Sequence, residues 1–394
     1  MSAENKTGTG VLALLPILFG FFVMGFADLI GDFTSRLAQD KALGFTDGEA
    51  SFLPMMIFIW FFLASIPAGM MTSRMGRKNT VLFSLAVTFA AMLLPYVAYT
   101  KYTICVSFAL LGIGNTIIQT ALPALMRNVT SAEQLTSRLS LGQFMKALFA
   151  AISPFVAVLA AERFGDWRLV FPIYAVVTLL AAVWLLMTPV KREEVQTQMT
   201  TFGGCLALLG NPFILAMFSG IFFVVGLDVG FNCAIKPYLN AVCAVALDST
   251  QAALGLTVYF VARTVGSFLG AIILAKFSPA KCFPFSALLM FAGTVALLFV
   301  RDITLVYVCL FVAGLGLSNI FGMIFGQAMN RVPSKTNEVA GLMVMAIAGG
   351  GVLIPLMNAL KTSIGANGLV YVLLGVSAYL IGLGVFAAKQ AKRA

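Results

Sequence analysis

The chain has 394 residues, of which 60% are hydrophobic and only 10% are charged. This composition excludes a soluble globular domain and is typical of a polytopic membrane protein. The 25 Lys and Arg residues exceed the 15 Asp and Glu residues, and His is absent. Any proton chemistry at neutral pH must therefore use carboxylates or a Lys residue with a shifted pKa.

Twelve apolar windows of about 20 residues follow in chain order, each long enough to cross a bilayer core of about 30 Å as a helix. They begin near Val11, Ala50, Thr80, Tyr102, Leu139, Leu169, Pro212, Gln251, Cys282, Thr304, Val339 and Leu369. A polar segment at 190–201 separates six windows from six. We expect an all-α membrane protein with one six-helix bundle over residues 1–190, a cytoplasmic linker over 191–204 and a second six-helix bundle over 205–394.

The Lys and Arg residues of the predicted loops lie mainly on the side that holds both termini, with Arg74, Arg77 and Lys78 as one cluster. Because cytoplasmic loops carry the excess of Lys and Arg, both termini are predicted to be cytoplasmic. The basic balance thus reflects topology, and we expect no nucleic-acid partner. We expect a multi-pass monomer in the lipid bilayer of a bacterial inner membrane.

The two halves of the chain resemble one another. The matching pairs are Phe21-Phe-Val-Met-Gly25 with Phe222-Phe-Val-Val-Gly226, the ladder Asp28, Asp32, Arg36 with Asp228, Asn232, Lys236, and Gly112-x-Gly114 with Gly314-x-Gly316. A duplicated six-helix unit is typical of transporters that rock two halves about a central site near the membrane midplane.

The first span carries two carboxylates within its apolar run. Asp28, Asp32 and Arg36 recur every four residues, which places them on one stripe of a helix. An ionisable group at membrane depth costs at least about 2.5–3.5 kcal/mol, so it usually faces a bundle interior or a hydrated cavity. The alternative is that one Asp only caps or staples the helix. We predict that Asp32 first, and Asp28 second, couples transport to protons, because an Asp that alternates between dry and Lys-paired surroundings gains and loses a proton.

Four further ionisable residues lie inside predicted spans, namely Lys146, Asp228, Lys236 and Arg263. Together with Asp28 and Asp32 they make three acidic and three basic residues. Their charges would cancel if the six side chains came together. Since an isolated buried charge is costly, we expect Lys146 to lie near an acid of the first span and to take part in proton coupling. The alternative is that the basic side chains snorkel to the interface.

Amide side chains at membrane depth offer donors and acceptors, as a polyhydroxylated ligand requires. The predicted substrate-binding residues are Asp28, Gln143, Lys146, Gln119, Asn115, Asn232, Asp228, Arg263 and Asn319, with Phe26 and Tyr259 as aromatic faces. For each aromatic residue, lipid contact or core packing is the alternative. The six Cys residues show no C-x-x-C spacing and are interpreted as packing residues. No nucleophile with its base, metal cluster or nucleotide loop is recognisable, so we expect no enzyme, metal or cofactor.

One loop sequence matches the pattern of a known family. Gly69-Met-Met-Thr-Ser-Arg74-Met-Gly76-Arg77-Lys78 resembles the loop between spans two and three of the major facilitator superfamily, written G-x-x-x-D-R-x-G-R-R. Ser73 stands where that family prefers Asp, which predicts a weaker charge contact between loop and helix. The resemblance implies a major facilitator fold of twelve helices in two pseudo-symmetric six-helix bundles.

Four stretches resemble, more narrowly, the fucose/galactose/glucose:proton symporter group, which includes fucose permease. They are Ala27-Asp28-Leu-Ile-Gly-Asp32 beside its A-N-N-x-N-D, Ile66-Pro67-Ala68-Gly69 at the end of span two, Arg138-Leu-Ser-Leu-Gly-Gln143 beside its R-L-N-L-A-Q, and Val344-Met-Ala-Ile-Ala-Gly349-Gly350 with Pro355 in span eleven. The resemblance implies that Asp32 is the essential Asp, that Asp28 takes the sugar-contacting Asn position, and that Gln143 is the span-five Gln.

Two departures from that group stand out. Its span-four Glu, part of its proton relay, has no counterpart here beyond the nearby Gln119, and Lys146 stands where the group often has Asn. The missing Glu and the added Asp28 and Lys146 indicate that the proton-coupling site is built differently from that of the group. The sequence thus predicts a proton-coupled importer of a hexose or deoxyhexose, with Na⁺ in place of H⁺ left open. A carrier of an anionic sugar or organic acid, bound by Lys146 and Arg263, and a proton-driven drug exporter are the alternatives.

Overall fold

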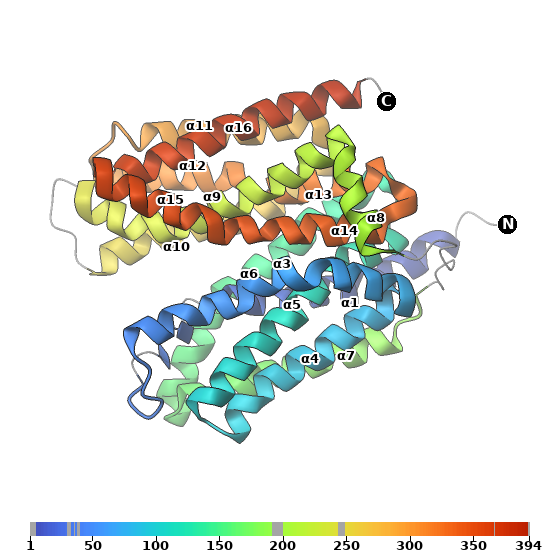
Figure 1. Ribbon diagram of the computed structural model, residues 1–394, viewed down its shortest axis with the longest axis horizontal. Helices are drawn as coiled ribbons and strands as arrows, with labels where there is room; N and C mark the ends of the chain where they lie inside the picture. Colours follow the sequence, from blue (N-terminus) through green and yellow to red (C-terminus); the bar gives the residue numbers. More distant parts are fainter. Residues whose placement is uncertain are drawn as a thin grey trace. The chain divides into compact units, whose positions relative to one another are not determined.

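The computed structural model of the protein describes residues 5–29, 33–34, 36–37, 40–190, 200–242, 249–365 and 367–392. Every regular element in these ranges is helical (Figure 1). The prediction of an all-α chain is therefore confirmed. Most of the predicted linker lies at 191–199, outside the described residues.

Eleven helices in the described ranges are long and apolar enough to cross a membrane, and α1 (Asn5–Met24) adds a shorter apolar stretch at Ala13–Met24. Together they account for the twelve predicted spans. The eleven begin at Phe52, Arg77, Lys101, Ala132, Trp167, Pro212, Leu254, Pro279, Ile303, Pro333 and Asn367. Most predicted starts lie within a few residues of these, and the largest difference is at the fifth span, where Ser131 caps the helix well before the apolar run begins.

The first of two compact units consists mainly of N-terminal helices. It contains α1, η1 (Gly25–Leu29), α3 (Asp47–Met75), α4 (Arg77–Val97), α5 (Lys101–Val129), most of α6 (Ala132–Phe164), η2 (Trp167–Leu169), α7 (Val170–Met187), α8 (Phe202–Ala207), η4 (Pro333–Lys335) and α14 (Thr336–Met345). Within it, α5 packs against α1, α3, α4 and α14. Because α5 contacts so many helices, it is deeply buried, with 72% of its apolar window inside.

The second unit consists mainly of C-terminal helices. It contains residues 136–144 of α6, η3 (Leu208–Gly210), α9 (Pro212–Val242), α10 (Ser249–Leu274), α11 (Pro279–Ala296), α12 (Ile303–Leu317), α13 (Ile320–Arg331), η5 (Ala346–Ala348), α15 (Gly349–Ile364) and α16 (Asn367–Ala391). Here α12 packs against α10 and α11, α16 packs against α11, and α9 packs against α15 and α16.

The helix contacts repeat between the units, as the matching sequences predict. A Cβ atom on Gly114 of α5 would lie 3.3 Å from the Ser84 carbonyl oxygen of α4, and one on Gly316 of α12 would lie 2.7 Å from the Ser286 carbonyl oxygen of α11. At both places glycine lets two helix backbones approach closely, which is common between membrane helices. The duplicated glycines therefore occupy equivalent contacts.

The loop that resembles the family motif contacts α14 inside the first unit through the side-chain amide of Asn337. Arg77 Nε donates a hydrogen bond to Asn337 Oδ1 at 2.9 Å, and Asn337 Nδ2 donates to Ser73 Oγ at 3.0 Å. The Ser73 hydroxyl also bonds to that of Thr200, just before α8. Ser73 thus replaces the expected charge contact with a hydrogen bond to an amide.

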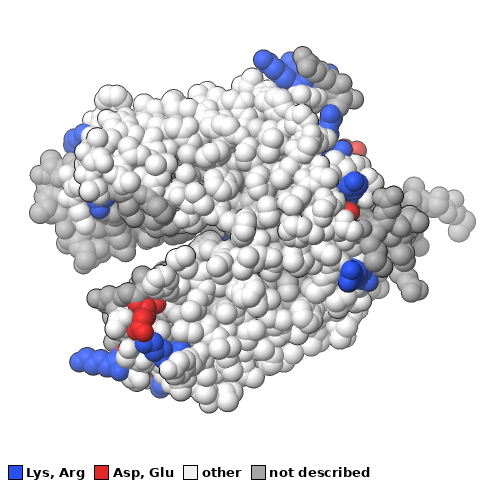
Figure 2. All heavy atoms as spheres, viewed as in Figure 1, with Lys and Arg blue, Asp and Glu red and all other residues white. Residues whose placement is uncertain are grey.

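Charged side chains lie near the helix ends on the face shown in Figure 2, and the broad sides of the helices carry none there. One such end is the start of α3, where Thr46 and Glu49 form a capping box and Glu49 Oε1 lies 2.5 Å from Lys101 Nζ. The hydrogen bonds from Lys101 and from Thr46 lower the pKa of Glu49 from 4.5 to about 2. This polar cap marks the edge of the apolar span that begins at Phe52.

Candidate functional site

The first span breaks where its acidic stretch begins. The α-helix α1 ends at Met24, and residues Gly25–Leu29 continue as the tighter 3-10 helix η1, which carries Asp28. A Cβ atom on Gly25 would lie 2.8 Å from the Lys146 carbonyl oxygen of α6 and 3.1 Å from Phe149. The missing side chain therefore lets the break lie directly against α6.

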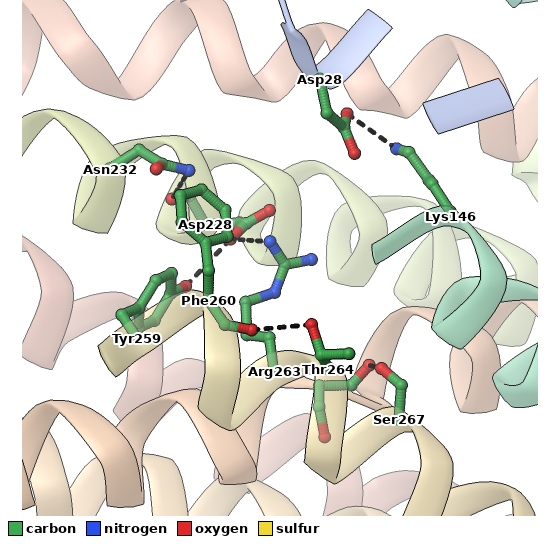
Figure 3. A network of polar contacts seen from close by, with 10 residues as sticks. Asp28, Lys146, Asp228, Asn232, Tyr259, Phe260, Arg263, Thr264 and Ser267 are labelled. Carbon is green, nitrogen blue, oxygen red and sulfur yellow. Dashed lines mark hydrogen bonds and ion pairs between the residues drawn. The ribbon is translucent and has the colours of Figure 1, made fainter. Parts of the chain in front are cut away.

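Asp28 and Lys146 form an ion pair at this break. Asp28 Oδ1 lies 3.1 Å from Lys146 Nζ, and the two side chains are 39% and 19% exposed (Figure 3). The expectation that Lys146 lies near an acid of the first span is confirmed. Asp32, the first predicted coupling residue, lies outside the described residues. Because the pair is only partly enclosed, its acid can meet both a protein cation and water.

Aromatic side chains from α1, η1, α6 and α7 pack against one another, and Phe26 and Phe149 among them lie near this pair in the sequence. The Phe26 ring centroid lies 4.5 Å from that of Phe149 and 5.0 Å from that of Tyr174, and Phe26 is 1% exposed. Phe22 meets Phe149 edge-on at 4.8 Å. Phe26 is thus placed in the core, as the alternative interpretation of the aromatic residues expected.

Two predicted amides, Asn115 and Gln119, lie one turn apart on α5. Asn115 Nδ2 donates to the Met24 carbonyl oxygen at 2.9 Å, and Gln119 Nε2 donates to Asn115 Oδ1 at 2.7 Å. The two residues are 2% and 7% exposed. Both therefore use their hydrogen-bonding groups inside the helix packing.

A second ion pair lies in the other unit, on α9 and α10. Arg263 Nη1 lies 2.8 Å from Asp228 Oδ1, and the Tyr259 hydroxyl donates to the same oxygen at 2.9 Å (Figure 3). Asn232, one turn along α9, donates from Nδ2 to the Asp228 carbonyl oxygen at 3.4 Å. Tyr259 is fully buried and stacks on Phe231 at 5.1 Å. The four predicted residues Asp228, Asn232, Tyr259 and Arg263 are therefore brought together.

The remaining predicted residues have different surroundings. Asn319, at the junction of α12 and α13, donates from Nδ2 to the Gly266 carbonyl oxygen of α10 at 2.7 Å and is 8% exposed. Gln143 is half-buried on α6, about one turn before Lys146. The side chain of Lys236 lies outside the described residues. Within the described part of the chain, no group of three His, Cys, Asp or Glu residues could hold a metal ion.

The prediction omitted Gly25 and Phe149, which shape the first ion pair. Gly25 sets the close approach of η1 to α6, and Phe149 packs on both Phe22 and Phe26. The sequence does single out Gly25, because it ends the stretch that is repeated at Gly226. That repeat indicates a duplication and does not by itself indicate a close helix contact. Nothing in the sequence distinguishes Phe149 from the many other Phe residues of the chain.

Comparison with known proteins gives a consistent result. The sequence profile described as Major Facilitator Superfamily matches residues 12–355. A protein of Brucella abortus biovar 1 (strain 9-941), named glucose/galactose transporter, is 25% identical over 373 residues, covering 90% of this chain and 89% of the relative.

Two solved structures share the fold. The fucose:proton symporter FucP of E. coli superimposes with a TM-score of 0.83 at 18% identity, covering 96% of this chain and 99% of FucP. The proton:xylose symporter XylE gives a TM-score of 0.69 at 15% identity, covering 100% of this chain and 96% of XylE. At these identities the likeness establishes the fold, and the twelve-helix architecture predicted from the sequence is confirmed.

Proposed function

This chain belongs to the Major Facilitator Superfamily, and from that premise we propose that it imports a neutral monosaccharide, a hexose or a deoxyhexose, together with a proton by alternating access. The family is one of transporters, so the prediction that the chain is not an enzyme is confirmed. The names of the glucose/galactose transporter, the fucose:proton symporter and the proton:xylose symporter support the choice of sugar and proton.

The observation that carries the proposal is the ion pair at the break of the first span. Asp28 is the described acid of that span and lies 3.1 Å from Lys146, with 39% of its side chain exposed. When its carboxylate binds a proton from water, the attraction to Lys146 is lost, and when it releases the proton the attraction returns. A conformational equilibrium that favours one state of the pair is thereby linked to the side from which the proton comes.

The charge balance of each ion pair favours a neutral substrate. Lys146 and Arg263 each already contact an aspartate of their own unit, at 3.1 Å and 2.8 Å. An anionic sugar would have to displace one of these carboxylates and leave a partly enclosed aspartate without its cation, which is unfavourable. Sugar hydroxyls can instead add hydrogen bonds to paired charges, because each hydroxyl both donates and accepts.

The direction and placement of the protein complete the proposal. Arg74, Arg77 and Lys78 lie at the junction of α3 and α4, and loops of this kind face the cytoplasm under the positive-inside rule. Both termini would then be cytoplasmic in a bacterial inner membrane. Each unit carries its own ion pair, so one chain in the bilayer contains the proposed machinery and functions as a monomer.

Transport by the purified protein in liposomes would test this function. A panel of neutral hexoses, deoxyhexoses and pentoses, with sugar acids as a second set, is offered with an inward proton gradient, an inward sodium gradient or neither. Uphill accumulation of a neutral sugar driven only by the proton gradient is expected. The Asp32→Asn variant, in the same first-span stripe, is expected to lose accumulation while it keeps counterflow exchange.

The other outcomes have definite meanings. Accumulation of sugar acids alone would replace this proposal by an organic-anion carrier, and accumulation with sodium alone would replace the proton. Unchanged uphill uptake by Asp32→Asn would remove Asp32 from the mechanism. Proton-driven extrusion of lipophilic drugs without sugar uptake would make the protein an exporter.

A further inference from the structure

Helix α1 receives a hydrogen bond from a neighbouring helix at Met24, where it tightens into η1. The last carbonyl groups of an α-helix have no amide partner one turn ahead, and they must be satisfied by side chains, water or a tightened turn. At Met24 that partner includes the Asn115 amide nitrogen, at 2.9 Å. Asn115 comes from α5, a span with 72% of its apolar window buried. The break is therefore attached to a rigid neighbour.

Gln119 determines which way the Asn115 amide points. Its Nε2 donates to Asn115 Oδ1 at 2.7 Å, so this oxygen is occupied and the nitrogen faces Met24. A carbonyl oxygen accepts only from a donor, and an amide turned the other way would set two oxygens against each other at Met24. The chain Gln119 to Asn115 to Met24 is thus a directed series of hydrogen bonds.

The break in turn fixes the ion pair. The Gly25 position that follows Met24 leaves no room for a side chain against the Lys146 carbonyl oxygen, and Asp28 is three residues further on in the same 3-10 helix. A shift of the break by a few tenths of an ångström would move the Asp28 carboxylate relative to Lys146. From this geometry we infer that Asn115 and Gln119 are positioning residues, which hold the break in the first span and thereby set the Asp28–Lys146 pair.

The second unit supplies an internal comparison. The residue after the second glycine of each repeated pair is Asn115 in α5 and Leu317 in α12, and four residues later the chain has Gln119 and Phe321. The unit without the amides also lacks the break, because α9 runs as one helix from Pro212 to Val242 through the position equivalent to Gly25. Between the two matching helices, the amide pair and the change to a 3-10 helix therefore occur together at α1 and are both absent at α9.

This role goes beyond the proposed function. In it, both amides hold the Asp28–Lys146 ion pair in position and do not bind the substrate. Asn115 and Gln119 are 2% and 7% exposed, and each already has a partner in the protein, so a passing sugar finds little of them to contact. The effect on coupling rests on the proposed function. The effect on the helix break does not, and the test separates the two.

Hydrogen exchange of the peptide that covers residues 20–29 is the transport-independent measurement. Gln119→Met keeps the volume but removes the donor, and exchange in this peptide is expected to rise by about tenfold, since a lost buried hydrogen bond changes a local opening equilibrium by about that factor. Thr120→Val is the matched control. Thr120 is also buried on α5, but its hydroxyl donates to Thr116 of the same helix. This control is expected to leave the peptide unchanged.

Gln119→Glu gives a readout that a packing role would not produce. As a neutral carboxylic acid the new side chain can still donate to Asn115, whereas as a carboxylate it accepts and turns the Asn115 nitrogen away from Met24. Exchange relative to wild type at the same pH should therefore stay near 1 in acid and rise with pH. Both members of the ion pair, Asp28 on η1 and Lys146 on α6, are retained in this variant.

Three results would overturn the inference. They are unchanged exchange in Gln119→Met, equal changes in Gln119→Met and Thr120→Val, or a Gln119→Glu variant that differs from wild type by the same factor at every pH. In transport, Gln119→Met is expected to lose uphill accumulation before it loses counterflow. If the wild type accumulates no sugar with protons, the proposed function fails, while the exchange result still decides the positioning role.

Discussion

The two ion pairs of the protein have the same chemistry but different construction. In one unit, Asp28 lies on a short 3-10 helix at a break and meets Lys146 at 3.1 Å. In the other, Asp228 lies within the long helix α9 and meets Arg263 at 2.8 Å. The two aspartates lie in matching helices, offset by one residue relative to Gly25 and Gly226, whereas their cations come from helices that do not correspond, α6 and α10.

The second pair is held more firmly than the first. Asp228 Oδ1 accepts from both Arg263 and Tyr259, and its side chain is 21% exposed against 39% for Asp28. Arg remains protonated at any physiological pH and has a planar array of donors, whereas Lys is a mobile point charge whose pKa is readily shifted. A firmly held, permanently charged pair is suited to binding, and a partly open Asp–Lys pair at a helix break is suited to changing its protonation.

Neutralising each aspartate in turn tests this difference, and it gives the largest expected effect. Asp28→Asn cannot carry a proton, so the accumulation ratio in a proton gradient should fall to about 1, because a group with no differential protonation cannot bias the two conformations. Asp228→Asn should retain proton-driven accumulation but raise KM by about tenfold, as expected when one charge-assisted contact is lost. The measurement is uphill uptake beside counterflow exchange for both variants.

The opposite result would exchange the roles of the two aspartates. If Asp228→Asn abolished accumulation and Asp28→Asn changed only KM, proton coupling would belong to the C-terminal pair. Equal losses in both variants, with normal amounts of folded protein, would mean that the two aspartates act together in coupling. In either case the helix break would not mark the coupling site.

The sequence was sufficient for the fold because the relevant signal is local. Apolar windows set the spans, and the stripe at Asp28 and the duplicated motifs set the repeat. The partner of Asp28 was also predictable, since an isolated charge is costly at membrane depth and few cations are available. The cost of burying an unpaired charge thus left few possible partners for Asp28.

The rest of the site depends on contacts between distant segments. Asn115 and Gln119 look like sugar ligands in the sequence, but their groups are used on Met24 and on each other. Phe26 offers an aromatic face in the sequence and is enclosed by Phe149 and Tyr174 in the structure. An amide or aromatic side chain has the same chemistry in a cavity and in a core, so burial decides its role, and burial is a property of the packed helices.

Tyr259→Phe sharpens the comparison by a smaller effect. This change removes one of two donors to Asp228 Oδ1 and leaves Arg263 in place, so KM should rise by about three- to fivefold, the effect of one hydrogen bond worth about 1 kcal/mol. Accumulation should persist. Tyr238→Phe is the control, because the Tyr238 hydroxyl is equally buried on α9 but donates to the Leu297 carbonyl oxygen. A KM change of the same size in both variants would show a general packing effect and refute a specific support of Asp228.

The smallest effect is expected at Glu49 and Lys101, an ion pair of the same chemistry at the edge of the apolar spans. Exposed pairs of this kind contribute little to stability. The hydrogen bonds from Lys101 and Thr46 hold the pKa of Glu49 at about 2, below its ordinary 4.5. A lowered pKa gives a contribution that is complete above the ordinary value and is lost as the pH falls toward 2, so it is constant across the range of transport.

Glu49→Gln should therefore lower the unfolding temperature only slightly and leave the pH profile of uptake between about pH 5 and 8 unchanged. Asp28→Asn should abolish accumulation throughout the same range, so that its profile becomes flat. Parallel uptake curves at several pH values, beside thermal unfolding, make the comparison. If Glu49→Gln altered the pH profile as much as Asp28→Asn, acid–base pairing anywhere in the protein would affect transport, and the position of Asp28 at the helix break would explain nothing about coupling.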